Sequence, residues 1–557
     1  MSRWQFRVSL FVLFAMSSVV RILIPPNPLY GAGHDDELMV KVAFNLSRGE
    51  WLGDYGTEGH LLLAKPPGYS IFLASTYWLP WAPTVSIHIL ILLGVLLLLR
   101  ELRSLGASRN FLVCTTAVFV SIPTLFNEQM SRIYREGFLV AITTLVLAFS
   151  LMMGRQLLAL TKADHFSFYR RDIWNFACCA IGIGILLGFF VISKPSWHLV
   201  VLLAIGLPAS GIAVTHGSFK KFMTYFLAYM MIAGVVTSAI TGSVLIFNDS
   251  KFGVRVIDNY SQGQFAAAIK QMYGVEDKNS RPYVTVSSYM RNQMYRVSPT
   301  LQKLKPFLEG PPNTGWKAAS CSSSLRICDE STVWFPWELR DALQLAGLGK
   351  TAKDFEINFG KIKDEIATGC DSGIIRCGRQ GLAPGVISIF KMSKRSIIDS
   401  YGSALAFLLD SNMGYGERSY SSNPTLPVPK IWHKIVNGLP PAHVSTSYET
   451  DDLVLGDLRI SIAKLHQYFW VVVVLLGLTT FLFPIRAIRG RSKIKQLMLM
   501  QSVMIVGFLL FVGQLSLLQA SSGEYLVGGG AIYLLPLLPV LWMAFNLFAI
   551  RVKVCRD

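Results

Sequence analysis

Charged side chains are scarce in this sequence. Only 15% of its 557 residues are Asp, Glu, Lys or Arg, whereas 52% are hydrophobic. A soluble protein carries roughly 25% charged residues, so this composition excludes an ordinary soluble chain. Several apolar runs instead approach the roughly 20 residues that a helix needs to cross a bilayer. The composition therefore predicts a membrane protein with several spans.

Three further features are missing. The sequence has no repeat of fixed period, which excludes a solenoid. It has no basic, aromatic-interleaved segment, so the net charge of +18 does not indicate a nucleic-acid partner. No small-x-small cleavage site precedes Pro25. We therefore expect the apolar run after Arg3 and Arg7 to be a retained first helix rather than a signal peptide.

The apolar runs predict about ten membrane spans. They lie near residues 8–24, 84–99, 110–126, 137–153, 176–193, 197–214, 222–246, 467–484, 497–518 and 530–549. Lys and Arg gather in alternate connections, and the positive-inside rule then places both termini in the cytoplasm. The prediction is an all-α polytopic helical bundle whose α-rich extracytoplasmic domain is inserted before the last three helices. Its parts are a transmembrane module (1–246), the extracytoplasmic domain (247–466) and C-terminal transmembrane helices (467–557).

Four of the eight cysteines lie in the predicted extracytoplasmic domain. They are Cys321, Cys328, Cys370 and Cys377. Six residues lie between Cys321 and Cys328, and six lie between Cys370 and Cys377. An even number of cysteines in an oxidising compartment favours disulfides. A zinc site is the alternative, but zinc ligands usually have about two to four residues between them. Two local disulfides are the preferred prediction, although the sequence does not fix their connectivity.

Helical patterning appears in the same domain. Apolar residues recur at intervals of three and four over Trp337–Ala346 and again over Thr351–Ile366. This spacing predicts two amphipathic helices.

An acidic run follows the first predicted span. Asp35, Asp36 and Glu37 come directly after His34, and topology does not require them because acids contribute little to membrane orientation. A solvated turn is the plain alternative. Apolar residues at helical spacing follow as far as Gly49, so we expect the acids to begin an amphipathic helix along the membrane surface. The helix dipole favours acids at that position.

Cations lie on the same predicted side of the membrane. They are Lys65, Arg132, Arg135 and Lys194, and Glu136 stands beside two of them. Charges at the ends of membrane helices are often simple interface anchors. Here carboxylates and cations together surround one outer edge, where a lipid phosphate would lie. This combination favours a functional site.

These motifs resemble the GT-C superfamily of polytopic glycosyltransferases, which use polyprenyl-phosphate sugars. Its members include protein O-mannosyltransferases and the lipid A aminoarabinose transferase, and the sequence looks most like bacterial members of the RgtA/B/C/D-like type. The resemblance covers about the first 200 residues. The matching residues are Asp35-Asp36, Ala43, Asn45-Leu46, Gly49, Trp51–Tyr55, Lys65-Pro66-Pro67, Arg132 and Arg135-Glu136.

One departure from the family pattern occurs late in the chain. Tyr533–Pro536 is similar to an Arg-Tyr-Leu-x-Pro stretch of many relatives, but Ile532 stands where the Arg is usual. This puts a substrate contact assigned there in doubt. Glu524 and Tyr525, in the preceding predicted turn, become the candidates for that contact.

The resemblance implies an inverting transferase in a bacterial inner membrane. It would move a sugar from a polyprenyl-phosphate donor, held at the membrane lipid, to a glycan, lipid or protein acceptor on the extracytoplasmic face. The general base would be Asp35, with Asp36 the next choice, and Glu136 would orient the base or position the acceptor. The predicted ligands of the donor phosphate are Lys65, Arg132, Arg135 and Lys194. Further substrate contacts are predicted at His34, Glu37 and His60.

No cofactor is required by these motifs. A divalent cation held by Asp35, Asp36 and Glu136 stays an open alternative, because carboxylates alone do not specify Mg²⁺ or Mn²⁺.

Two other classes of function compete with a transferase. A transporter or flippase of lipid-linked glycans would place its charges near the bilayer midplane on broken helices, whereas here they lie at the outer edge. An inactive scaffold of transferase ancestry would bind a partner through its exterior domain. The intact Asp35, Asp36, Lys65 and Glu136 argue against that scaffold.

Overall fold

The computed structural model describes most of the chain up to residue 378 and two short C-terminal segments. The described residues are 1–23, 26, 35–55, 61–120, 125–126, 128–162, 170–194, 198–214, 219–277, 281, 284–312, 314–322, 326–378, 496–507, 535–544 and 546–547. Every regular element within these ranges is a helix. The all-α prediction is therefore confirmed for the described residues.

Five helices are long and apolar enough to cross a membrane. They are Arg3–Ile22, Pro83–Ser104, Arg135–Thr161, Asp172–Val191 and Phe219–Phe252, and they match five of the predicted spans. These helices make the protein an integral membrane protein. These five spans are parts of the helices α1 (Arg3–Leu23), α4 (Pro83–Ser104), α7 (Arg135–Lys162), α8 (Arg170–Val191) and α10 (Phe219–Phe252).

The other predicted spans are shorter in the structure or described only in part. Two of them correspond to α5 (Arg109–Val120) and α9 (His198–Ala209), and α9 continues into the 3-10 turn η3 (Ser210–Val214) after Pro208. Apolar helices at Gln496–Gly507 and Leu535–Ala544 lie within the predicted spans 497–518 and 530–549, apart from one or two residues at the boundary. The span predicted at 467–484 lies outside the described residues. The total of ten therefore stays a prediction.

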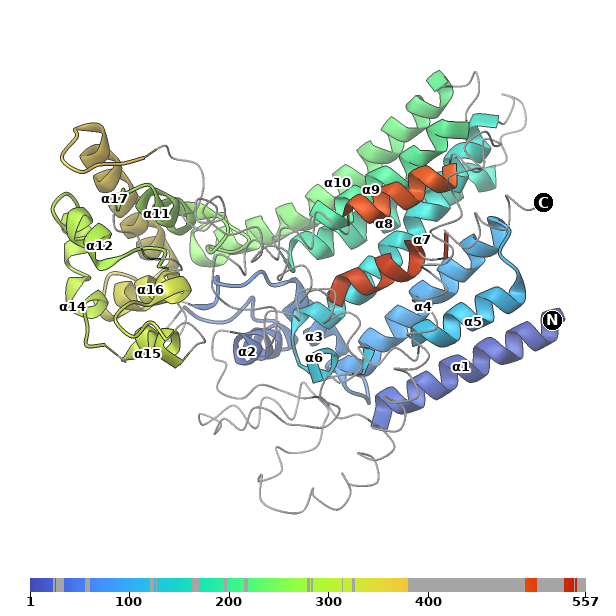
Figure 1. Cartoon of the computed structure of the whole chain (residues 1–557), viewed down its shortest axis with the longest axis horizontal. Coiled ribbons are helices and arrows are strands. Elements are labelled where there is room, and N and C mark those ends of the chain that lie inside the picture. Colours follow the sequence, from blue (N-terminus) through green and yellow to red (C-terminus); the bar gives the residue numbers. More distant parts are fainter. Residues whose placement is uncertain are drawn as a thin grey trace, which may run out of the picture.

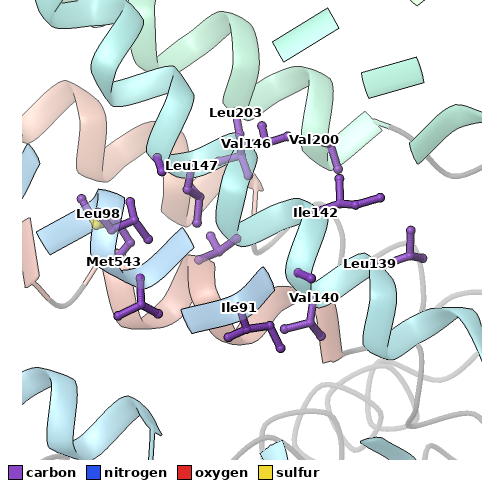
Figure 2. Close-up of a cluster of buried hydrophobic side chains, with 14 of the residues drawn as sticks. Ile91, Leu98, Leu139, Val140, Ile142, Val146, Leu147, Val200, Leu203 and Met543 are labelled. Carbon is purple, nitrogen blue, oxygen red and sulfur yellow. The ribbon is translucent and has the colours of Figure 1, made fainter. Parts of the chain in front are cut away.

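Helix α7 is the centre of the bundle. Its side chains are buried along most of its length, between α4, α8 and α9. Figure 2 shows this packing, with Ile91 of α4 near Val140 of α7 and Leu203 of α9 near Val146 of α7. Because α7 is held on several sides, the residues at its first turn have a fixed position.

The two ends of the bundle differ in character. At one end the Arg109 guanidinium donates to the Met1 carbonyl at 3.1 Å, and Arg155 pairs with Glu101 at 2.8 Å. The N-terminus lies at this end (Figure 1). These contacts bring together connections that the charge pattern placed on one side of the membrane. Which side this is stays a prediction.

Three short helices lie at the opposite end of the bundle (Figure 1). They are α2 (Asp36–Ser47), α3 (Gly68–Thr76) and α6 (Glu128–Ser131). Helix α2 buries Leu38, Met39 and Val42 and ends just before Gly49, whose φ is +81°. The helix predicted after the acidic run is therefore confirmed, with the acids at its start, and its position along the membrane surface stays a prediction.

A helical module follows α10 and comprises the described residues between 254 and 378. Its core forms where α11 packs against α17, around Phe265, Phe355 and Phe359. The helices α16 and α17 confirm the two that the sequence predicts in this region. The module comprises α11 (Gly263–Tyr273), α12 (Ser288–Tyr295), α13 (Pro299–Gln302), α14 (Lys305–Leu308), α15 (Gly315–Ser322), η4 (Thr332–Trp334), α16 (Phe335–Leu345) and α17 (Ala352–Asp371).

Two disulfides cross-link the module. Cys321 is joined to Cys328 and Cys370 to Cys377, which confirms the predicted local disulfides. The second bond fastens the end of α17 to the chain near Val275, where an isolated bridge pairs Val275 with Cys377.

Candidate functional site

The site lies where the segment between α1 and α4 meets the start of α7 and the end of α8. The backbone N–H of Gly68 donates to the Ile192 carbonyl at 2.7 Å. A Cβ at residue 68 would come within 2.8 Å of that oxygen and closer still to Ser193 Oγ. Only glycine therefore permits this close approach. The contact docks the Lys65–Gly68 segment against the turn that carries Lys194.

Asp35 forms the exposed part of the site. Its Oδ1 lies 2.6 Å from Lys65 Nζ and accepts a long hydrogen bond of 3.4 Å from the Tyr134 hydroxyl. Asp35 occupies the N-cap position of α2, but its side chain does not cap the helix. The side chain is 34% exposed. Its carboxylate is therefore held at one oxygen and remains accessible.

Asp36 has a very different environment from its neighbour. Its side chain is fully buried, and the Arg132 guanidinium grips both oxygens: Nε lies 2.9 Å from Oδ1 and 3.0 Å from Oδ2, and Nη2 lies 2.7 Å from Oδ1. This fork is the geometry in which Arg binds a carboxylate most firmly. Asp36 therefore ties α2 to the segment before α7.

Glu136 is the third carboxylate and is also fully buried. Lys194 Nζ lies 3.0 and 3.2 Å from its two oxygens, and Arg135 Nε lies 3.4 Å from Oε1. Glu136 stands in the first turn of α7, where the helix dipole favours a negative charge. The pair with Lys194 joins the start of α7 to the end of α8.

Tyr134 connects the two halves of this cluster. The guanidinium of Arg132 lies 4.6 Å from its ring centroid and that of Arg135 lies 5.4 Å away, distances at which cation–π attraction operates. The sequence prediction did not assign Tyr134 a role. Its position within Arg132–Glu136 is the only signal that could have indicated one.

Among these seven side chains, cations outnumber carboxylates. Four cations, Lys65, Arg132, Arg135 and Lys194, face three carboxylates, Asp35, Asp36 and Glu136, which leaves one positive charge in excess. Of the cation–carboxylate contacts, that of Arg135 is the longest. Arg135 also acts electrostatically on the carboxyl of Asp258, which is described below.

Charge and burial together set the protonation of these groups. Burial opposes ionisation of Asp35, but Lys65, Arg132 and Arg135 outweigh it and lower the pKa of Asp35 to about 2. Burial lowers the pKa of Lys194, with Glu136 acting in the opposite direction. For Arg132 burial is likewise unfavourable, yet Asp36 raises the pKa above its ordinary value. The Asp35 carboxylate is consequently ionised throughout the physiological range.

The helical module also reaches the site. Trp337 of α16 lies below Lys65, whose Nζ is 5.2 Å from the ring centroid. The backbone N–H of Asn259 donates to the Leu63 carbonyl at 2.7 Å, and Arg340 Nη1 donates to Asn259 Oδ1 at 2.6 Å. The loop that carries Lys65 is thus held by the module as well as by the bundle.

Asp258 is an additional acid near the site. It is buried, and its carboxylate accepts from the backbone N–H groups of Tyr260 and Ser261 at 3.1 and 2.7 Å and from Ser261 Oγ at 2.5 Å. Burial raises its pKa, while the Ser261 bonds and Arg135 act against that rise. Asp258 follows the acidic run by more than 200 residues. No local motif in the sequence indicates that it lies here.

The structure thus brings together Asp35, Asp36, Glu136, Lys65, Arg132, Arg135 and Lys194. Glu37 is partly buried in the first turn of α2. His34, His60, Glu524 and Tyr525 lie outside the described residues. Within the described ranges, no group of three or more His, Cys, Asp and Glu side chains is arranged to hold a metal ion. Asp35, Asp36 and Glu136 each pair with a cation.

Known proteins resemble this chain only weakly. No family model and no curated protein matches the sequence. ArnT from Cupriavidus metallidurans in the apo state is 13% identical, with 97% of this chain and 77% of that chain covered and a TM-score of 0.31. The same protein bound to undecaprenyl phosphate is 12% identical, with 98% and 77% covered and a TM-score of 0.28. No argument about family, fold or function is drawn from these two likenesses.

Proposed function

We propose that the protein is an inverting membrane glycosyltransferase that takes a sugar from a polyprenyl-phosphate donor on the extracytoplasmic face. The motif resemblance suggests the reaction, and one observation carries the assignment of roles. Of the three carboxylates in the cluster, only Asp35 has a partly exposed side chain, whereas Asp36 and Glu136 are fully buried in ion pairs. Asp35 is therefore the carboxylate that an acceptor hydroxyl can reach.

The proposed reaction is a single displacement. The acceptor oxygen attacks the anomeric carbon of the donor sugar while Asp35 takes the proton of that hydroxyl. The bond between the anomeric carbon and the phosphate oxygen breaks at the same time, and polyprenyl phosphate leaves with the electron pair. Attack opposite the leaving group inverts the anomeric carbon. Lys65 and Arg135 stabilise the charge that develops on the phosphate.

Donor binding would also adjust the base. In the resting protein Lys65, Arg132 and Arg135 hold the pKa of Asp35 at about 2, which makes it a weak base. A donor phosphate adds negative charge close to these cations. The cations then stabilise the ionised Asp35 carboxylate less, and the pKa of Asp35 rises. The carboxylate therefore becomes basic only when a donor is present.

Asp36 and Glu136 act as positioning residues in this proposal. Asp36 fixes Arg132 and the start of α2, and Glu136 holds Lys194 and Arg135. Removing either carboxylate would leave a buried cation without compensation. Their loss should therefore impair folding and donor binding together, unlike the loss of Asp35.

The test is transfer by the purified full-length protein in proteoliposomes. The protein is supplied with a panel of labelled undecaprenyl-phosphate sugars and candidate glycan, lipid and protein acceptors, and products are scored by mass spectrometry. The proposal expects one donor to yield a glycosylated product with an inverted linkage. Movement of donor across the bilayer without transfer would instead identify a flippase, and the absence of both activities would favour a scaffold.

A further inference from the structure

Arg340 of α16 is a fully buried cation that the proposed reaction does not use. Its guanidinium carbon lies 5.1 Å from the ring centroid of Phe265, 4.8 Å from that of Phe355 and 5.9 Å from that of Trp337. Burial lowers the pKa of Arg340 to about 10, so the side chain still carries its charge at neutral pH. A buried charge is costly unless its contacts compensate for it. The polar contacts of Arg340 therefore indicate its role.

A second buried arginine of the module provides a comparison. Arg291 is 1% exposed and pairs with Glu309 and with Glu330, in each case at 2.7 Å. The Tyr295 hydroxyl donates to the same Glu309 at 2.8 Å. All four residues belong to the module. The Arg291 network therefore connects parts of the module with one another.

Arg340 instead contacts the residue that holds the loop of Lys65. Its Nη1 donates to Asn259 Oδ1 at 2.6 Å, and the backbone N–H of Asn259 donates to the Leu63 carbonyl at 2.7 Å. Asn259 is buried, so water does not compete for these bonds. Lys65 follows Leu63 by two residues, and its Nζ lies 2.6 Å from Asp35 Oδ1. Two hydrogen bonds and two residues of chain thus connect Arg340 with the pair of Lys65 and Asp35.

Trp337 makes a second connection between Arg340 and Lys65. Lys65 Nζ lies 5.2 Å from the ring centroid of Trp337, and Arg340 contacts the same ring. Trp337 and Arg340 are three residues apart on α16, which places them on the same side of the helix. A change at Arg340 would therefore affect both the ring that Lys65 contacts and the hydrogen bonds that hold its loop.

Apolar packing also attaches this loop to the module, but it does not aim the Lys65 side chain. Leu63 is buried in an apolar cluster whose members from the module are Val254, Val256 and Ala352. Burial of apolar surface is non-directional, whereas a hydrogen bond depends strongly on its angle. The hydrogen bonds through Asn259 are therefore suited to fix the register of the loop. In Figure 1, α16 lies in the module, and α2, which begins beside Asp35, lies between the module and the bundle.

We propose that Arg340 is a positioning residue, which holds Lys65 against Asp35. It acts through the hydrogen bonds of Asn259 and through the ring of Trp337. Its effect on donor binding rests on the proposed transferase function, in which Lys65 contacts the donor phosphate. The fixed position of Lys65 does not rest on that function.

The position of Lys65 is tested without turnover, by amine labelling of the full-length protein in nanodiscs. The probe is acetic anhydride at trace concentration, and the labelled fraction of Lys65 is measured by mass spectrometry after digestion. Arg340→Met removes the charge and the hydrogen bond but keeps a flexible side chain that fits among aromatic rings. We expect Lys65 to be labelled at least threefold faster in Arg340→Met than in the wild type. Arg340→Lys keeps a charge and a donor and should lie nearer the wild type.

Two controls separate positioning from a general loosening of the protein. Lys194 pairs with Glu136 and is 7% exposed, so its labelling rate is an internal reference and should not change. Tyr295→Phe removes one buried hydrogen bond of the Arg291 network and should leave the labelling of both lysines unchanged.

A second variant breaks the same connection without removing the charge. Asn259→Ala removes the oxygen that accepts from Arg340, and it should speed the labelling of Lys65 as Arg340→Met does. Thermal melting checks that each variant is folded. In the transfer assay, Arg340→Met and Asn259→Ala should each raise KM for the donor at least fivefold, whereas Tyr295→Phe should not.

The outcomes distinguish this proposal from the proposed function. Unchanged labelling of Lys65 in both Arg340→Met and Asn259→Ala would overturn the role of Arg340, and so would an equal rise at Lys65 and Lys194. Selective labelling of Lys65 in a protein that transfers no sugar would refute the transferase and leave the role of Arg340 in place.

Discussion

Adjacent acids at residues 35 and 36 have opposite environments. Asp36 is fully buried in a two-pronged pair with Arg132, whereas Asp35 is 34% exposed and held at one oxygen. A buried ion pair is costly to break, because the remaining charge stays in a low-dielectric place. A partly exposed carboxylate can exchange its partner for solvent or substrate. The two residues should therefore respond differently to the same substitution.

The first prediction compares stability in Asp36→Asn and Asp35→Asn. Asp36→Asn leaves Arg132 uncompensated and should lower the free energy of unfolding by about 3–5 kcal/mol, measured by thermal and denaturant unfolding in detergent. Asp35→Asn should change it little. In the double variant Asp36→Asn with Arg132→Gln, much of the loss should be recovered. Equal destabilisation by both single variants would show that the burial of Asp36 has no special energetic consequence.

The second prediction concerns pH. Because the folded pKa of Asp35 is lowered from 3.8 to about 2, its charge and the stability from its pairing are present at neutral pH and are lost only as pH falls from about 4 to 2. The wild-type profile of kcat/KM should therefore show no acidic limb from Asp35 above about pH 4. Lys65→Met removes the largest opposing charge, so the pKa of Asp35 should rise and an acidic limb should appear at higher pH. Superimposable profiles for the two proteins would contradict this assignment.

Residue roles were only partly predictable from the sequence. The acids and cations could be identified because topology does not require them at those positions. The sequence analysis preferred Asp35 to Asp36 as the base, but it did not reveal their different environments, since these depend on Lys65 and Arg132, which come from separate segments. No pattern in the sequence predicts that the proposed phosphate ligands Lys65, Arg132 and Lys194 each pair with a carboxylate.

At the scale of elements, the site depends on how one loop docks against the bundle. The Lys65–Gly68 segment fits against Ile192 and Ser193 because residue 68 has no side chain. Two residues before this segment, the Leu63 carbonyl accepts a hydrogen bond from the backbone N–H of Asn259 in the module. Lys65 therefore owes its position to contacts on two sides.

The third prediction is that Gly68→Ala disturbs this docking. Its Cβ would lie within 2.8 Å of the Ile192 carbonyl oxygen, and such overpacking should cost about 1–3 kcal/mol of stability. Donor binding should weaken as Lys65 and Lys194 move apart, measured with labelled donor on the purified protein. Gly137→Ala is the matched control, because its Cβ would find its nearest neighbour at 3.7 Å. A Gly68→Ala protein with wild-type stability and donor affinity would show that this contact is unimportant.

Elements with a strong local pattern were predictable, and contacts between distant elements were not. Helices α2, α16 and α17 follow from apolar residues at intervals of three and four, and α17 begins with a capping box at Thr351 and Asp354. The rings of residues 260, 316, 334 and 337 contact one another in the module, although their spacing in the sequence has no period. These contacts arise only from tertiary packing of the module.

At the scale of the whole molecule, all functional proposals require the site and the module to face the exterior. The basic connections gather at one end of the bundle, and the site lies at the other (Figure 1). Positive charge favours the cytoplasmic side. We therefore predict that the site lies outside, in the compartment where the two disulfides of the module would also form.

The fourth prediction tests this orientation with single cysteines and a membrane-impermeant maleimide. Asp54→Cys replaces a side chain that is 92% exposed near the site, and it should be labelled in intact cells. Ser104→Cys, at the exposed end of α4 on the basic side, should be labelled only after the membrane is opened. The unsubstituted protein measures the background from its own cysteines. The reverse pattern would place the site in the cytoplasm and exclude an extracytoplasmic reaction.

The role of Asp35 as general base is tested most directly by sugar transfer in Asp35→Asn proteoliposomes, with donor binding measured on the same preparation. Asparagine keeps the size of the side chain but cannot accept the proton at neutral pH. Loss of at least a hundredfold in kcat is expected, with the protein folded and donor affinity within a few-fold of wild type. Transfer at a wild-type rate by Asp35→Asn would contradict the assignment of the base.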